Sequence, residues 1–318
     1  MSKPPVLVTR RLPASVVELL EQHGDVEMNT RAASLSHEEL IARVPGKSAL
    51  VCLLTDKIDR ALLDAGRDLK IVANVAVGYD NVDLAAAREH GVVITNTPDV
   101  LTEAVAEFTW GLILAATRRI PESDRVVRSG QWRGWGLDYM LGMELRGKQL
   151  GIVGYGRIGR AVAARAGAFG MHVGYFDRAG LPPDRESGAR AMSFDELLVS
   201  SDVISIHTPL TEETQHLFDR RALARMKRSA YLVNTARGPV IDEEALAWAL
   251  AEGLIAGAAL DVYEREPDVH PDLLTRSNVV LAAHLGSATR ETRTAMAELA
   301  ARNVIAVLGG NPPLTPVG

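Results

Sequence analysis

Short apolar runs alternate with segments of helical periodicity along almost the whole chain. A long helical segment at residues 101–130 divides these runs into two series. This alternation is typical of parallel β-sheets that are covered by helices on both faces. We therefore expect an α/β fold with two doubly wound parallel-sheet domains, Rossmann-like or flavodoxin-like, and a cleft between them. The expected strands are residues 5–9, 48–54, 70–77, 92–97, 149–154, 172–177, 202–208, 230–236, 256–262 and 278–284.

The composition excludes several classes of function. A net charge of −5 gives no electrostatic case for binding nucleic acid or an anionic membrane. The single cysteine, Cys52, excludes an intramolecular disulfide and a cysteine metal cluster. No histidine pair has metal-ligand spacing with supporting carboxylates, so we expect no metal. The first residues lack the long apolar core of a signal peptide, and no apolar run is long enough to cross a bilayer, so we expect a cytoplasmic protein.

The segment QLGIVGYGRIGRAVAARAGAFG at residues 149–170 contains the pattern GxGxxG. Gly154 permits a tight turn, Gly156 lets the backbone approach a pyrophosphate, and Gly159 lets the helix pack closely on the strand. An expected strand precedes the motif and an amphipathic helix follows it, which is the context that a dinucleotide site requires. The anion would lie on the N–H groups of the helix N-terminus.

The next expected strand ends at Asp177, which follows the glycine motif by about the interval that the fingerprint requires. A carboxylate there accepts hydrogen bonds from the ribose hydroxyls and repels a 2′-phosphate. This favours NAD(H). The neighbouring Arg178 could accommodate such a phosphate, so NADP(H) remains possible.

Four charged side chains end later strands of the second series or lie just beyond them: Arg237, Asp261, Glu266 and His284. Taken singly, each can be a solvated surface residue. Because ligands of an open α/β sheet bind beyond the carboxyl ends of its strands, we expect these residues to converge on the nicotinamide.

Several ordered motifs make the chain similar to the D-isomer-specific 2-hydroxyacid dehydrogenases over nearly its whole length, and most similar to the glyoxylate/hydroxypyruvate reductases. They are residues 75–107, the glycine fingerprint, HTPLTEETQHLF (207–218), VNTARGPVID, ALDVYEREP and AHLGSAT. Residues 129–154 point toward the glyoxylate reductase branch.

The resemblance implies reduction of a small 2-oxoacid by hydride transfer. Arg237 would anchor the substrate carboxylate, and His284 would give a proton to the keto oxygen as general acid. Glu266 would fix the tautomer of the histidine. The implied cofactor-binding residues are Thr102, Gly154, Gly156, Arg157, Ile158, Gly159, Asp177, Arg178, Thr208, Pro209, Thr214, Thr235, Ala236, Asp261 near the carboxamide, and Gly286. The implied substrate-binding residues are Leu53, Ala76, Val77, Gly78 and Trp135.

The resemblance also implies a discontinuous substrate domain, residues 1–98 plus 287–318, and a dinucleotide-binding Rossmann domain at residues 99–286. It implies a homodimer formed through residues 101–145. Trp135 either reaches the partner's substrate pocket or is an ordinary interface or core tryptophan.

Other functions stay open at this point. One is a broad-specificity 2-ketoacid or 2-ketogluconate reductase, or another D-2-hydroxyacid dehydrogenase. The alternative of another class is an NAD(H)-sensing protein like the transcriptional corepressors built on this scaffold.

Overall fold

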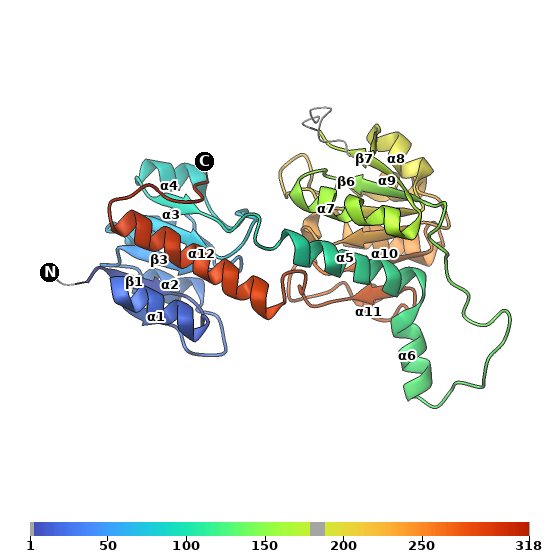
Figure 1. Cartoon of the computed structure of the whole chain (residues 1–318), viewed down its shortest axis with the longest axis horizontal. Helices are drawn as coiled ribbons and strands as arrows, with labels where there is room; N and C mark the ends of the chain where they lie inside the picture. The colour runs from blue at the N-terminus through green and yellow to red at the C-terminus, as the bar shows by residue number, and fades with distance from the viewer. Residues whose placement is uncertain (1–2, 179–187, 318) are drawn as a thin grey trace. The chain divides into compact units, whose positions relative to one another are not determined.

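The computed structural model describes residues 3–178 and 188–317 (Figure 1). The chain divides into two compact units, Met1–Leu101 with Thr289–Gly318 and Thr102–Ala288. Each unit contains one sheet in which all strand pairs are parallel. The predicted α/β fold with two parallel sheets is therefore confirmed. No helix in the described part of the chain is long and apolar enough to span a membrane.

The sheet of the first unit has the order β2-β1-β3-β4-β5. All residues of β3 and β4 are buried, which agrees with the continuous apolar runs of the sequence. The last helix, α12, belongs to this unit and packs on α1, β3 and β4 (Figure 1). The elements are β1 (Pro5–Val8), α1 (Ala14–His23), β2 (Asp25–Met28), α2 (His37–Arg43), β3 (Ala49–Cys52), α3 (Arg60–Ala65), β4 (Ile71–Asn74), α4 (Leu84–Glu89), β5 (Val93–Thr95) and α12 (Arg290–Leu308).

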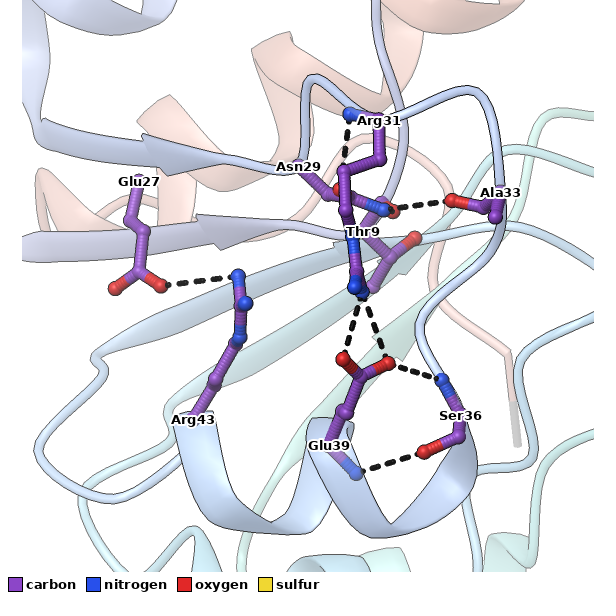
Figure 2. Close-up of polar contacts among 8 residues, drawn as sticks. All are labelled: Thr9, Glu27, Asn29, Arg31, Ala33, Ser36, Glu39 and Arg43. Carbon is purple, nitrogen blue, oxygen red and sulfur yellow. Dashed lines mark hydrogen bonds and ion pairs between the residues drawn. The ribbon is translucent and has the colours of Figure 1, made fainter.

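The loop after β2 is closed by polar contacts (Figure 2). Asn29 is only 3% exposed and donates a hydrogen bond to the carbonyl of Thr9 at 3.1 Å. Arg31 forms an ion pair with Glu39 at 2.8 Å, and Glu39 completes a capping box with Ser36 at the start of α2. No predicted site residue lies in this loop.

The sheet of the second unit has the order β12-β11-β10-β9-β6-β7-β8. The chain order reverses between β6 and β9, which is the switch point where open α/β sheets bind ligands. Both faces are covered, because Leu232 and Val233 of β10 enter core clusters on opposite faces. The elements are α5 (Thr102–Thr117), α6 (Ile120–Arg128), β6 (Gln149–Val153), α7 (Arg157–Ala166), η1 (Gly167–Phe169), β7 (His172–Phe176), β8 (Arg190–Ala191), α8 (Phe194–Ser200), β9 (Val203–Ile206), α9 (Arg220–Arg225), β10 (Tyr231–Asn234), η3 (Gly238–Val240), α10 (Glu243–Ala251), β11 (Gly257–Leu260), α11 (Pro271–Leu274) and β12 (Val279–Leu281).

The long helical segment expected at residues 101–130 is two helices. Arg119 adopts a left-handed conformation with φ of 55° and separates α5 from α6. α5 is largely buried, whereas α6 buries no residue. The segment at residues 129–141 then extends away from the rest of the second unit, and the chain returns to the core at Leu145 (Figure 1). We call α6 with residues 129–141 the arm.

Candidate active site

The glycine motif forms the turn between β6 and α7. Gly154 has φ of 89°, and a Cβ there would lie 2.7 Å from the backbone of His207. A Cβ on Gly159 would lie 2.2 Å from the carbonyl oxygen of Gly154, so helix and strand can meet only at a glycine. A Cβ on Gly156 would meet nothing within 4 Å. The backbone is therefore open at the start of α7, where a pyrophosphate would approach.

The end of β7 brings two opposite charges next to this turn. Asp177 accepts a hydrogen bond from the N–H of Tyr155 at 2.8 Å. Arg178 pairs with Glu213 at 3.2 Å. The pKa of Glu213 falls to about 2 because Thr211, its own backbone N–H and Arg178 all stabilise the carboxylate. Arg178 is therefore already engaged by a negative charge.

Arg237 follows β10 on a turn that Asn234 holds. Asn234 is fully buried, donates to the carbonyl of Arg237 at 2.9 Å and accepts from the N–H of Ala236 at 3.0 Å. A Cβ on Gly238 would lie 1.9 Å from the carbonyl of Tyr263, so only glycine fits after Arg237. The turn after β10 thus lies in backbone contact with the loop after β11.

His284 and Glu266 form a hydrogen-bonded pair, with 2.8 Å between Nδ1 and Oε2. Burial alone raises the pKa of Glu266, but the bond from His284, the charge of His284, the N–H of Tyr263 and the charge of Arg237 outweigh it and hold the pKa below its usual value. Both side chains keep about 30% exposure, with 30% for His284 and 29% for Glu266. The imidazole is therefore oriented by a carboxylate and still accessible.

Asp261 fixes the backbone around His284, which has φ of 54°. Its carboxylate accepts the N–H groups of Leu285 at 2.6 Å and Gly286 at 2.8 Å, and its carbonyl accepts that of His284 at 2.9 Å. Burial raises the pKa of Asp261, and the two backbone hydrogen bonds oppose this rise. These bonds hold a left-handed conformation that is uncommon for residues other than glycine. The predicted contact of Asp261 with a carboxamide stays a prediction.

The remaining predicted cofactor residues lie in the second unit. Arg157 and Ile158 begin α7, and Thr102 begins α5. The others follow strands β9, β10 and β12 at the same edge of the sheet, namely Thr208, Pro209, Thr214, Thr235, Ala236 and Gly286. Five strands of this sheet, β6, β7, β10, β11 and β12, thus carry the predicted glycine, acidic, arginine and histidine residues to one edge.

The predicted substrate residues of the first unit follow β3 and β4, namely Leu53, Ala76, Val77 and Gly78. A buried polar network that the sequence reasoning missed holds these loops. Asn74 is fully buried and donates to the carbonyl of Gly78 at 3.0 Å and to Asn81 Oδ1 at 3.1 Å. Asn81 donates to the carbonyl of Leu53 at 3.2 Å, and Asp56 accepts the N–H of Leu53 at 2.8 Å. The sequence signal for this network was Asn74, a single asparagine inside an apolar run.

Trp135 lies in the arm with 84% of its surface exposed. It is therefore not a core residue of its own chain. Other large apolar side chains of the arm are also exposed, namely Ile120, Val127, Trp132, Leu137, Tyr139 and Leu141.

Known proteins resemble this chain in sequence and in structure. A glyoxylate reductase from Thermococcus onnurineus is 49% identical, over 98% of this chain and 95% of its own. The structure of the TT0316 protein from Thermus thermophilus superposes with a TM-score of 0.93 at 46% identity, over 99% of this chain and 100% of its own. An NADPH-dependent glyoxylate/hydroxypyruvate reductase from Sinorhizobium meliloti, solved with NADP and malonate, gives a TM-score of 0.89 at 35% identity, over 100% and 97%. Residues 110–286 match the family model of the D-isomer specific 2-hydroxyacid dehydrogenase NAD binding domain. The chain belongs to the D-isomer specific 2-hydroxyacid dehydrogenase family.

Proposed function

We propose that the protein uses a nicotinamide cofactor to reduce small 2-oxoacids, glyoxylate and hydroxypyruvate among them, to 2-hydroxyacids. The observation that carries the proposal is the 2.8 Å pair of His284 and Glu266, whose carboxylate also feels the charge of Arg237. An acid, its orienting carboxylate and a guanidinium are what reduction of a 2-oxoacid needs. The names of the relatives support the same substrate class.

In the proposed mechanism the bound nicotinamide supplies the hydride. Arg237 binds the substrate carboxylate and keto oxygen through its planar fork. His284 donates the proton from Nε2 to the keto oxygen, while Glu266 holds the proton on Nδ1. Gly78 and Val77 would offer backbone N–H groups to the carboxylate. We assign the substrate role to residues 1–98 with 287–318 and the cofactor role to residues 99–286.

For the cofactor we propose a preference for NAD(H). Asp177 would accept the ribose hydroxyls and repel a 2′-phosphate. Arg178, which would have to neutralise that phosphate, is already paired with Glu213. The relative from Sinorhizobium meliloti is NADPH-dependent, so NADP(H) is the alternative.

For the quaternary state we propose a homodimer in which the arm packs on a second copy. Trp135 and Leu137 are exposed to 84% and 82%, and burying such side chains is favourable. The expected reach of Trp135 into a partner's substrate pocket is part of this proposal.

The test is loss of NADH absorbance with glyoxylate, hydroxypyruvate, pyruvate and 2-ketogluconate. We expect the highest kcat/KM on glyoxylate or hydroxypyruvate. A preference for 2-ketogluconate would favour the broader reductase. Tight NADH binding without turnover of any of the four would favour a sensor.

A further inference from the structure

Two carboxylates outside the proposed catalytic set fasten the loop of Glu266 to the start of α10. Glu243 accepts the N–H of Glu264 at 2.8 Å with one oxygen and that of His270 at 3.2 Å with the other. In return, Glu264 accepts the N–H of Glu243 at 3.0 Å. One side chain thus holds the loop on both sides of Glu266. We call these contacts the clasp.

Burial gives the clasp its strength. Glu243 is only 6% exposed, although it carries a carboxyl group. A buried carboxylate is costly unless it is hydrogen-bonded, and here both oxygens accept backbone N–H groups at the positive end of a helix. The second oxygen of Glu264 pairs with His216 Nε2 at 2.6 Å, nearer the surface.

The loop around Glu266 also has contacts of its own, since the N–H of Asp268 donates to the carbonyl of Arg265 at 2.8 Å. The remaining oxygen of Glu266 accepts the N–H of Tyr263 at 3.2 Å, the same length as the bond from His270 to Glu243. The bond to His284 is shorter, at 2.8 Å, and it depends on where the loop places the carboxylate. The charged groups that face this pair are Arg237 from the turn after β10 and Asp261 from the end of β11.

We infer that Glu243 is a positioning residue of the proposed reductase, which keeps Glu266 on Nδ1 of His284 by fixing the backbone of residues 264–270. The inference rests on the proposed function. If the clasp opens, Glu266 loses its fixed place, and the imidazole is free to turn. A displacement of about 1 Å at a reacting group can slow catalysis ~100-fold.

The test compares E243A and E243Q with E244Q as the matched control. Glu244 is the next residue of the same helix and is 79% exposed, so its change removes the same charge without touching the clasp. In E243Q one oxygen can still accept an N–H, but the amide group turns a donor toward the other. We expect kcat for glyoxylate to fall about 10-fold in E243Q and about 100-fold in E243A, with KM for NADH within about twofold. The solvent deuterium isotope effect on kcat should rise, because proton transfer becomes slower.

A second readout does not depend on turnover. The downfield Nδ1–H resonance of His284, assigned by its absence in H284N, should be present in the wild type and in E244Q and weakened or lost in the Glu243 variants. If E243A fails to fold, E243Q carries both readouts. The inference is overturned if the Glu243 variants match E244Q in kcat, isotope effect and resonance. It is also overturned if kcat and NADH affinity fall together with the isotope effect unchanged. An inactive wild type would refute the proposed function, while the resonance would still decide whether Glu243 keeps Glu266 bonded to His284.

Discussion

The two sheets use their carboxyl edges in different ways. In the second unit the edge carries ionisable side chains, with Arg237, Glu266 and His284 partly exposed. In the first unit Asn74 and Asp56 are buried at the edge, and Asn74 and Asn81 hold the loops whose backbone groups are proposed to bind substrate. Under the proposed function, one parallel sheet supplies reactive side chains while the other supplies a shaped backbone.

The difference has a physical origin. A proton donor must reach the reacting atom and must change its protonation state during the reaction. It therefore requires some access to solvent. A carboxylate can be bound by backbone N–H groups alone, provided that the loop is rigid. The amides of Asn74 and Asn81 give this rigidity together with the side chain of Asp56, which accepts the N–H of Leu53.

The largest expected effect is on the reactive edge. His284→Asn should lower kcat for glyoxylate by about 10²- to 10⁴-fold, because it removes the proposed general acid. KM for NADH should change little, since the glycine motif is untouched. Steady-state kinetics checks this, with His172→Asn at the exposed start of β7 as the control. Turnover near that of the wild type would remove His284 from the acid role.

The second effect tests the backbone edge. Asn74→Ala should raise KM for glyoxylate about 10-fold while NADH affinity stays constant, because the loop of Gly78 loses its hydrogen bond. It should also cost about 1 to 3 kcal/mol of stability, since polar groups are left unpaired.

Asn29→Ala is the matched control for this variant. Asn29 is also a buried asparagine of the first unit, but its loop carries no predicted site residue (Figure 2). It should lose similar stability with unchanged KM. Equal shifts of KM in both variants would mean that KM follows stability, and the contrast between the edges would collapse.

The sequence predicted the elements whose side chains make a continuous signal. Buried strands such as β4 are apolar runs, and Gly154 and Gly159 stand where the close contacts of the turn require glycine. The strands β2 and β8 were missed, because they lie at sheet edges and their residues are partly or fully exposed.

The supporting contacts of the site were missed for another reason. The clasp joins Glu243 to Glu264 and His270, which lie in different elements, and no local pattern marks such a pairing. Each glutamate alone reads as a surface residue, and only the fold shows that Glu243 is buried.

The third prediction concerns the arm, which belongs to the second unit only. Replacing Trp135 and Leu137 by serine should convert a dimer into a monomer at micromolar concentration, because it removes two exposed apolar side chains that the proposed interface would bury. Light scattering after size exclusion measures the mass. A monomeric wild type would discard the dimer.

A smaller effect is expected on cofactor choice at the reactive edge. Glu213→Gln should raise kcat/KM for NADPH about 3- to 10-fold and leave that for NADH unchanged, because it frees Arg178 and removes a negative charge. The double variant with Arg178→Gln should lose the gain. A gain that persists without Arg178 would show that repulsion by Glu213 alone sets the preference.

The smallest effect concerns a histidine of the same edge that is kept neutral. Burial lowers the pKa of His207 to about 3, from 6.5, and Ser205 contacts its Nε2 at 2.8 Å. Below pH 6.5 the unfolded chain therefore binds a proton that the folded chain does not. The stability from this group is complete above pH 6.5 and is lost as the pH falls toward 3.

Between pH 7 and 5 the Tm should drop by about 2 to 4 °C more in the wild type than in His207→Asn. His172→Asn should behave like the wild type, since His172 is exposed. If Tm falls in parallel with pH in the wild type, His207→Asn and His172→Asn, then His207 does not cause the loss of stability.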